Sequence, residues 1–403
     1  MTTTKADQSA KRESISPWLL LVLALLNSVA PVATDLYLPA FPEMTAELQA
    51  SATAVQLTLT AFLLGLTFGQ LLFGPLSDRV GRRGPLIVGA LLCVIASAVA
   101  ATAPTVGVLI AARFAQGFTG AAGLVIGRAV ISDLATGKAA GRAFSLMMIV
   151  GGVAPVAAPF AGGLLVGPFG WRGILWVVCA IAVAMLVSSI VVVRESHPPH
   201  RRAELKDAAA QGDSAWSALR SRAYIANTLA FAFGFSVMMA YISASPFVYQ
   251  VMVGLTPTQY GIAFGVNALG IIAVSALSAR LNRTISSAKL LGVGLGATML
   301  ATLVLLALAL TGAPTWLIPI PIFVTVACQG LILGNATALA LAAVPRAAGS
   351  GSAGLGALQF GLGAAVSPLV SLGGEHTAVP LAVVMVTLSV LAIAAFLAGR
   401  RVS

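Results

Sequence analysis

The chain has 403 residues, of which 59% are hydrophobic and only 9% are charged, and its formal net charge is +11. A soluble domain carries about 25% charged residues, and this composition would leave too much apolar surface in contact with water. It therefore excludes an ordinary soluble protein and indicates one that crosses a membrane several times.

Long apolar runs with few charges predict twelve membrane-spanning helices, because backbone polar groups in lipid must be paired within their own segment. The expected spans are 17–38, 52–76, 84–103, 106–128, 143–166, 172–193, 222–248, 257–279, 288–311, 315–340, 348–372 and 378–399. A polar tail, residues 1–16, precedes them. The alternative for the first span is a secretory signal cleaved after Ala30, and Pro31 directly after that bond disfavours cleavage.

The placement of lysine and arginine predicts the topology. If the N-terminus is cytoplasmic, every lysine and arginine except Arg113 and Arg172 falls in or beside a cytoplasmic segment. Cytoplasmic loops of membrane proteins carry an excess of these residues. We therefore expect both termini in the cytoplasm and an even number of spans. The same placement explains the positive net charge without a nucleic-acid partner.

An internal repeat divides the chain into two halves. The stretch "PLSDRVGRR" (75–83) follows the second expected span, and "ALSARLNRT" (276–284) follows the eighth, with Leu, Ser and two Arg residues matching at an offset of 201. The pattern predicts a six-span half at 17–193, a cytoplasmic linker at 194–221 and a second six-span half at 222–399. Two parallel repeats of this kind are typical of secondary transporters.

Five stretches together resemble one known family. They are "GPLSDRVGRR" (74–83), "ATDLYLPAFP" (33–42), "RFAQGFTGAAG" (113–123), "APVAAPFAGG" (154–163) and "SPFVYQ" (245–250) followed by "FGVNALG" (264–270). Through these stretches the chain resembles a major facilitator superfamily transporter. Within that superfamily it is most similar to the drug:proton antiporters of the bicyclomycin-resistance (Bcr/CflA) type. One departure is Ala158-Pro159, where Gly-Pro is commoner. The resemblance implies an all-α, twelve-helix fold that works by alternating access.

The charged stretch between the second and third spans is a candidate cytoplasmic latch. A simple positive anchor accounts for its arginines, but it does not account for Asp78 or the glycines. Asp78 is placed to face an arginine or a helix N-terminus, either of which stabilises a carboxylate. The resemblance implies that the latch joins the two halves in the outward-facing state. Its expected members are Gly74, Asp78, Arg79, Gly81, Arg82, Arg83, Arg128 and Asp133.

Asp35 is the acidic residue inside the predicted apolar spans, and Arg113 is a basic one. An ionisable group at membrane depth is costly and is a functional hypothesis by default. We interpret Asp35 as the proton carrier; the alternative is a hydrated residue at the outer end of its span. A buried arginine needs a partner, and family analogy offers Asp35 and Gln116. Protonation of Asp35 would then release Arg113. The alternative for Arg113 is a side chain that snorkels to the membrane surface.

The fifth span combines prolines with glycines, which bend a helix and allow close packing. The resemblance implies a role in antiport for Gly151, Pro155, Pro159, Gly162 and Gly163, and a merely kinked packing helix is the alternative. Polar and aromatic residues in other spans are candidates to line a substrate cavity: Asn27, Tyr37, Gln70, Gln116, Phe235, Tyr241, Phe247, Asn267, Asn335 and Gln359. Some related exporters carry an acid at the place of Asn27, so its neutral amide favours neutral or zwitterionic substrates.

These observations predict a proton-coupled exporter of amphipathic small molecules such as antibiotics. The sequence contains no phosphate-binding loop for ATP, so the energy for transport is expected to come from an ion gradient across the membrane. The lone cysteines indicate no metal site, and we expect no cofactor, no enzymatic activity and a monomer in the bacterial cytoplasmic membrane. An importer or metabolite exporter on the same fold is the nearer alternative, and a non-transporting membrane receptor is the more distant one.

Overall fold

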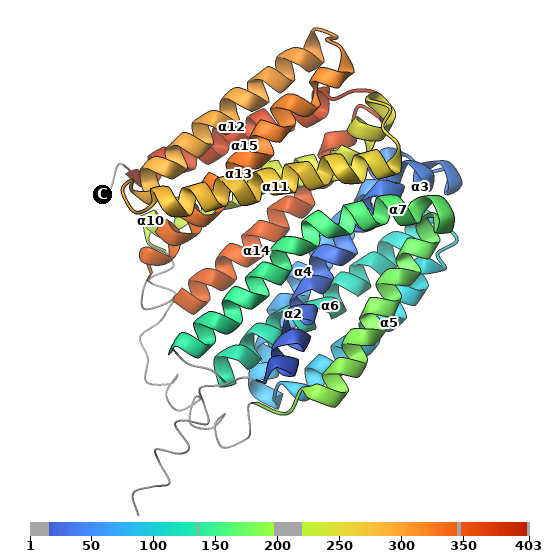
Figure 1. Cartoon of the computed structure of the whole chain (residues 1–403), viewed down its shortest axis with the longest axis vertical. Helices are drawn as coiled ribbons and strands as arrows, with labels where there is room; N and C mark the ends of the chain where they lie inside the picture. The colour runs from blue at the N-terminus through green and yellow to red at the C-terminus, as the bar shows by residue number, and fades with distance from the viewer. Residues whose placement is uncertain (1–15, 135–136, 197–219, 345–347, 401–403) are drawn as a thin grey trace, which may run out of the picture.

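The computed structural model describes residues 16–134, 137–196, 220–344 and 348–400 (Figure 1). For residues 17, 29, 137–156, 348–350, 353, 371 and 400 it describes the backbone alone. The first half contains α2 (Pro17–Asp35), η1 (Leu38–Ala40), α3 (Phe41–Glu47), α4 (Ala52–Val80), α5 (Arg83–Ala101), α6 (Val106–Leu134) and α7 (Gly137–Val192). The second half contains α10 (Arg222–Pro246), η2 (Phe247–Met252), α11 (Pro257–Leu281), α12 (Ser287–Leu310), η3 (Thr315–Leu317), α13 (Pro319–Ala342), α14 (Ala348–Val366), η5 (Ser367–Ser371) and α15 (Val379–Arg400).

The expected all-α fold with twelve spans is confirmed. Within the described ranges, ten helices are long and apolar enough to cross a membrane, and Gly354–Val370, in α14 and η5, is a shorter apolar helix. One of the ten is α7, which is interrupted at Gly170, where φ is +62°. The chain reverses there (Figure 1), so α7 supplies two spans, the fifth and the sixth.

Local sequence signals explain where several helices begin and end. Ser51 accepts a hydrogen bond from the N–H of Ala54 at the start of α4, and Thr256 forms a capping box with Gln259 at the start of α11. The end of α4 is set by Gly81, whose φ of +106° is unfavourable for any residue with a side chain. This turn is short because α5 begins at Arg83.

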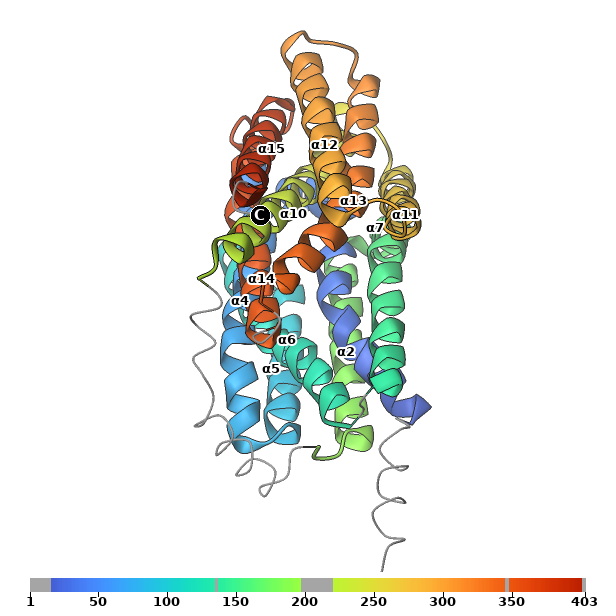
Figure 2. The ribbon, with the colours of Figure 1, turned by 90° about the vertical axis from the view of Figure 1, so that its left-hand side faces the viewer.

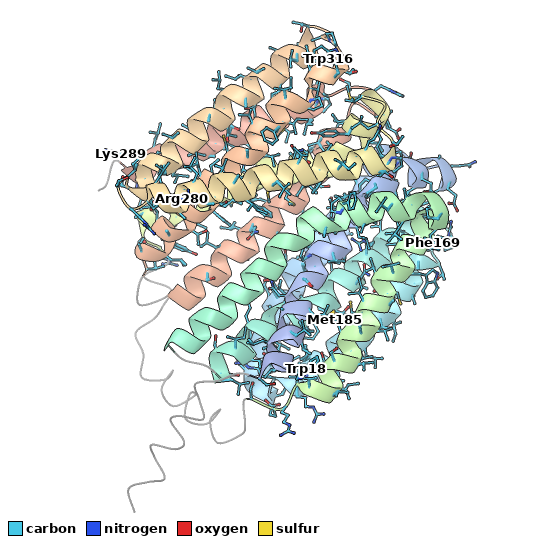
Figure 3. All side chains as sticks on the ribbon, in the orientation of Figure 1. Trp18, Phe169, Met185, Arg280, Lys289 and Trp316 are labelled. Carbon is cyan, nitrogen blue, oxygen red and sulfur yellow. The ribbon has the colours of Figure 1, made fainter. Side chains whose placement is uncertain are left out.

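The helices alternate in direction, so the molecule has two membrane sides, which we name by their residues. The tail side carries the start of α2, the α4–α5 turn, the end of α7 and the end of α15. The far side carries η1, α3, the turn at Gly170, η2 and η5. Exposed tryptophans lie near both boundaries, Trp18 on the tail side and Trp316 on the far side (Figure 3), as is common at membrane–water interfaces.

The two halves meet along two pairs of helices, α7 with α11 and α4 with α14 (Figures 1 and 2). At the far-side end of the first pair, glycines allow the backbones to touch. A β-carbon on Gly163 would lie 2.4 Å from the carbonyl oxygen of Pro257, and one on Gly261 would lie 2.7 Å from that of Pro159. Only glycine fits at such distances.

The apolar cores show that this conformation is closed on the far side. The largest cluster of buried side chains contains residues of both halves, including Phe41 of α3 and Phe247 of η2, whose ring centroids lie 6.1 Å apart. Two further clusters lie toward the tail side, and each belongs to one half alone. The halves therefore share a core on the far side and keep separate cores on the tail side.

Hydrogen bonds between the halves follow the same pattern. Gln56 donates to the carbonyl oxygen of Ser243 at 2.9 Å, Gln250 donates to that of Pro39 at 3.0 Å, and Thr258 donates to that of Gly163 at 3.1 Å. All three lie at far-side ends of helices. Because each bond joins one half to the other, opening the far side must break all of them.

Arg172, which the predicted topology leaves off the cytoplasmic side, lies in an ion pair on the far side. It pairs with Glu47 at the end of α3, and its guanidinium carbon lies 4.1 Å from the ring centroid of Trp171. The Trp171 indole N–H donates to the second oxygen of Glu47 at 2.6 Å. Glu47 therefore fastens the segment that follows Asp35 to the turn in the middle of α7.

Candidate functional site

Asp35 is the last residue of α2 and lies where the two halves meet. Its side chain is 5% exposed. The next peptide packs against α7, because a β-carbon on Gly162 would lie 1.9 Å from the carbonyl oxygen of Leu36. From the second half, Tyr241 of α10 and Tyr260 of α11 lie within electrostatic range of the Asp35 carboxylate. Asp35 is therefore buried, and the alternative of a hydrated residue is wrong for this conformation.

Arg113 lies on α6 and is completely buried, which rules out a snorkelling side chain. Its Nη2 donates to the carbonyl oxygen of Ala33 at 2.8 Å, and its Nη1 donates to Gln116. Its guanidinium also lies over two rings, 4.4 Å from the centroid of Tyr37 and 4.3 Å from that of Phe62. Such contacts with ring faces stabilise a buried cation.

The structure brings Arg113 to the α2 backbone beside Asp35 but not to its carboxylate. In the described part of the chain no ion pair within 4.0 Å joins the two residues. The expected partnership with Gln116 is present, and Gln116 in turn donates to Ser97 at 2.7 Å. In this conformation the buried cation is thus held by a carbonyl, an amide and two rings.

The second half places a cluster of hydroxyl and amide groups opposite Asp35. The Asn267 amide nitrogen donates to the hydroxyl oxygens of Tyr241 at 2.8 Å and Tyr249 at 3.1 Å. The hydroxyl groups of Tyr260 and Ser245 lie 2.9 Å apart. Two of the predicted cavity residues, Tyr241 and Asn267, are therefore in direct contact. Tyr249, Tyr260 and Ser245 were not predicted, although "SPFVYQ" contains two of them.

Other predicted cavity residues line the interior of each half. Tyr37 is buried and shares a hydrogen bond with Thr58. Phe235 is buried and contacts Phe360 of α14 edge-on. The Asn27 side chain is 8% exposed, and its amide oxygen has no partner among the described residues.

Three more predicted cavity residues lie away from Asp35. Gln70 of α4 faces Gly356 of α14 across the contact between the halves. Gln359 is half-buried on α14. Asn335 lies at the tail-side end of α13, where it accepts a hydrogen bond from Asn282 at 3.0 Å and donates to Ser278 at 2.9 Å. Asn335 therefore binds Asn282 of the α11–α12 turn, which is the second-half counterpart of the α4–α5 turn.

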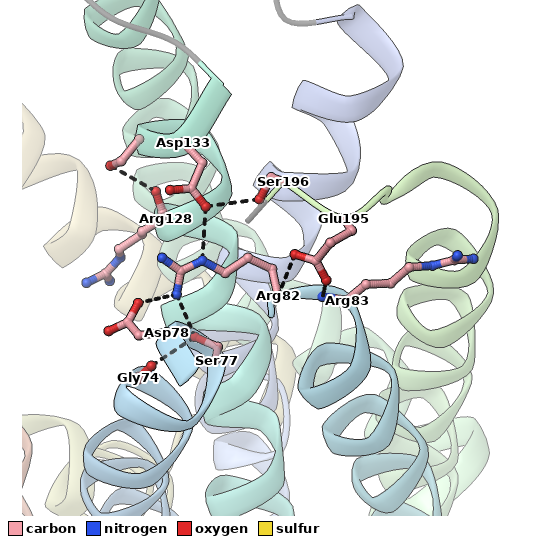
Figure 4. Close-up of polar contacts among 10 residues, drawn as sticks. Gly74, Ser77, Asp78, Arg82, Arg83, Arg128, Asp133, Glu195 and Ser196 are labelled. Carbon is pink, nitrogen blue, oxygen red and sulfur yellow. Dashed lines mark hydrogen bonds and ion pairs between the residues drawn. The ribbon is translucent and has the colours of Figure 1, made fainter. Parts of the chain in front are cut away.

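The predicted latch residues form a network at the α4–α5 turn, centred on Arg82 (Figure 4). The Arg82 guanidinium pairs with Asp78 and, at 3.0 Å, with Asp133 at the end of α6, and it donates to Ser77 at 2.8 Å. Burial acts to lower the pKa of Arg82, but its bonds to Asp133 and Asp78 outweigh burial, so the pKa lies above its ordinary value. All four residues belong to the first half.

Glu195, which follows the end of α7, completes this network and was not predicted. Its two carboxylate oxygens accept hydrogen bonds from the backbone N–H groups of Arg82 at 2.9 Å and Arg83 at 3.1 Å, at the start of α5 (Figure 4). A carboxylate at a helix N-terminus satisfies unpaired donors and opposes the helix dipole. Ser196 donates to Asp133 at 3.0 Å, so the end of α7 is tied to both α5 and α6.

The remaining latch candidates lie at the rim of the network. Arg79, Arg83 and Arg128 are exposed, and Arg83 also donates to the carbonyl oxygen of Ile190 at 3.1 Å. Gly81 leaves room for Glu195, because a β-carbon there would lie 2.6 Å from its carboxylate. Gly74 lies beside α6 without such crowding.

The residues of the fifth span are described in part. Gly162 and Gly163 make the close approaches given above, and Pro159 is buried. The side chain of Pro155 and the surroundings of Gly151 lie outside the described residues. In the described ranges, no group of three His, Cys, Asp or Glu side chains gathers to hold a metal ion.

Comparison with known proteins places this architecture in a family. Residues 23–368 match the Major Facilitator Superfamily. The chain is 38% identical over 377 residues to the uncharacterized MFS-type transporter YdgK of Bacillus subtilis, covering 93% of each chain. It is 30% identical over 378 residues to a bicyclomycin resistance protein homolog of Haemophilus influenzae, covering 93% of this chain and 94% of that one.

Among solved structures, the fold matches a bacterial homolog of the human lysosomal transporter Spinster in an inward-facing, unoccupied conformation. The TM-score is 0.77 at 19% identity, over 96% of this chain and 98% of the other. This likeness concerns the fold alone. With the sequence match, it shows that the chain belongs to the major facilitator superfamily of membrane transporters.

Proposed function

We propose that the protein exports amphipathic small molecules in exchange for protons by alternating access between its two halves. The observation that carries this proposal is Asp35, an acidic residue buried where the halves meet and not paired with a cation in the described part of the chain. The relative named for bicyclomycin resistance supports the class of substrate. Asp35 carries the proton, and substrate binds in the space between the halves.

The proposal includes a membrane orientation and a division of the chain. The tail side, where lysine and arginine gather, is cytoplasmic, and the membrane is the bacterial cytoplasmic membrane. The structure, closed on the far side, then corresponds to the inward-facing state. Residues 17–193 and 222–399 are the moving halves, 194–221 is the linker, and one chain is the working unit.

The α4–α5 network acts as a latch in the opposite state. Here its bonds stay within the first half, and the Asp78 side chain remains 62% exposed. An exposed carboxylate that is held in place by Arg82 is available to bind the second half when the tail side closes. At the equivalent turn of the second half, the neutral Asn282 donates to Asn335, and Arg280 and Arg283 are exposed.

The test uses inside-out membrane vesicles with a respiration-driven, acid-inside proton gradient. Ethidium, chloramphenicol and bicyclomycin are added in turn, and a pH-sensitive dye reports protons leaving the vesicle. We expect substrate-dependent proton release from the wild type and none from Asp35→Asn. Fluorescence of a C-terminal fusion verifies equal amounts of inserted protein.

Each outcome has a definite meaning. Equal release from both proteins would support antiport and remove Asp35 as the carrier. Release that requires substrate on the opposite side of the membrane would identify an importer. Solute uptake without any proton movement would contradict proton coupling.

A further inference from the structure

The turn between α11 and α12 carries three basic residues on the tail side of the second half. Arg280 lies in the last turn of α11, Arg283 lies in the connection, and Lys289 lies in the first turn of α12 (Figure 3). All three side chains are exposed, and in the described ranges none of them forms an ion pair. Glu375 is the only acidic residue between positions 222 and 399 of the sequence, and it lies between η5 and α15, on the far side. The second half therefore has no carboxylate of its own for these cations.

The equivalent turn of the first half supplies its own carboxylates. At the offset of 201, Arg82 corresponds to Arg283. Arg82 is buried and pairs with Asp78 and Asp133. At the place of Asp78 the second half has Ala279. The second half thus repeats the cation of this turn without the anions that neutralise it in the first half.

Neutral groups hold the α11–α12 turn in shape. Asn282 donates to Asn335 of α13 at 3.0 Å and accepts a hydrogen bond from Ser287 at 3.1 Å. Asn335 in turn donates to Ser278 of α11 at 2.9 Å. These side-chain bonds use none of the three cations. The cations are therefore available to a ligand from outside the bundle, and their replacement should leave the turn folded.

Two of the cations end apolar stripes that face the lipid. On α12, Lys289 is followed by the exposed Val293 and Leu300, at spacings of four and seven residues. On α11, Arg280 follows the exposed Leu277 by three residues. Residues at these spacings share one face of a helix. Basic side chains at the end of a lipid-facing stripe reach the level of the lipid head groups.

We propose that Arg280, Arg283 and Lys289 bind the phosphate of an anionic phospholipid in the tail-side leaflet, and that its acyl chains lie against α11 and α12. Arginine and lysine are the side chains that bind phosphate groups, and basic sites between transmembrane helices bind anionic head groups. The exposed apolar residues beside the cations favour a lipid over a free phosphate ion. The inference is independent of Asp35 and of the transported substrate.

The test measures lipid binding to the purified full-length protein in a neutral detergent by native mass spectrometry. The probes are phosphatidylglycerol and phosphatidylcholine with identical acyl chains. We expect the double variant Arg283→Gln with Lys289→Gln to bind phosphatidylglycerol at least tenfold more weakly than the wild type, because each basic residue adds to the attraction of an anionic lipid. Its binding of phosphatidylcholine should be unchanged.

Two further double variants separate this site from general charge and from folding. Arg194→Gln with Arg222→Gln removes the same charge from exposed tail-side positions outside the turn, and it should bind phosphatidylglycerol like the wild type. Arg283→Lys with Lys289→Arg retains both charges and should also keep wild-type binding. Equal weakening in the Arg194 and Arg222 variant would overturn the site, because any tail-side charge would then serve.

Two other results would also overturn the proposal. If inorganic phosphate displaces phosphatidylglycerol at an equal concentration, the turn is a free-phosphate site and the lipid assignment fails. If Arg283→Gln with Lys289→Gln lowers the melting temperature in phosphatidylcholine alone, the cations pair within the chain, for example with acidic residues of the linker 194–221. An unchanged melting temperature together with the selective loss of phosphatidylglycerol binding would support the site.

Discussion

Replacing Gly163 with alanine should prevent the far side from closing. The added β-carbon would lie 2.4 Å from the carbonyl oxygen of Pro257 and 3.1 Å from the Cα of Thr258, and these backbone atoms cannot rotate away. Overpacking of this kind costs about 2 kcal/mol, which changes the ratio of closed to open protein about thirtyfold. The contact joins the two halves, so this cost applies only to the closed state.

A cysteine beneath the closed far side reports the change. Val248 is 3% exposed on η2, and Val248→Cys in the purified protein would react with a bulky polar maleimide only after opening. Gly167→Ala is the matched control, because no atom lies within 4 Å of its added β-carbon and the gain in helix propensity is the same. We expect labelling to accelerate at least tenfold in Gly163→Ala and to stay unchanged in Gly167→Ala. Equal rates in the two variants would refute the reasoning.

Three further substitutions test separate parts of the structure. Asp78→Asn should impair transport of the drug panel while leaving membrane insertion and the melting temperature near wild type, because the side chain is largely exposed; normal transport would contradict the latch. Glu195→Gln removes one of the two oxygens that accept from the start of α5, which weakens this helix cap by about 1 kcal/mol. Hydrogen exchange at the Arg82 amide should therefore accelerate about fivefold, and an unchanged rate would show that Glu195 does not cap α5. Arg113→Lys cannot bond Ala33 and Gln116 in the same fork geometry and should lower the melting temperature by several degrees in a thermal-shift assay; an unchanged value would show that the fork contributes nothing.

The architecture was predictable because lipid leaves few alternatives. An apolar run of about twenty residues must be a helix in a bilayer, so run length alone located the twelve spans. The turn within α7 at Gly170 was also anticipated, between the expected spans 143–166 and 172–193. The closure of the far side could not be predicted from the length of apolar runs. It depends on which backbone surfaces of the two halves meet, such as Gly163 with Pro257.

The site was predictable in part. The bond of Arg113 to Gln116 follows from their spacing on one helix, three residues apart. The bond of Arg113 to the carbonyl oxygen of Ala33 could not be predicted, because every residue has a backbone carbonyl and the sequence does not show which one is used. Glu195 was missed for a related reason. It lies 112 residues from Arg83 in the chain and beside the hydrophilic linker. In such a segment the sequence gives no reason to distinguish an acidic side chain from an ordinary solvated charge.

The adjacent glycines of α7 connect the contact between the halves with the segment that follows Asp35. Successive residues of a helix point about 100° apart, so Gly162 presses on the peptide after Asp35 while Gly163 presses on the start of α11 in the other half. No side chain lies between these surfaces to absorb a displacement. Two adjacent residues of α7 therefore bring the backbone of Pro257, in the second half, and the backbone of Leu36, next to Asp35, against one short segment of helix. The contact between the halves and the segment after Asp35 are thus joined by backbone atoms alone.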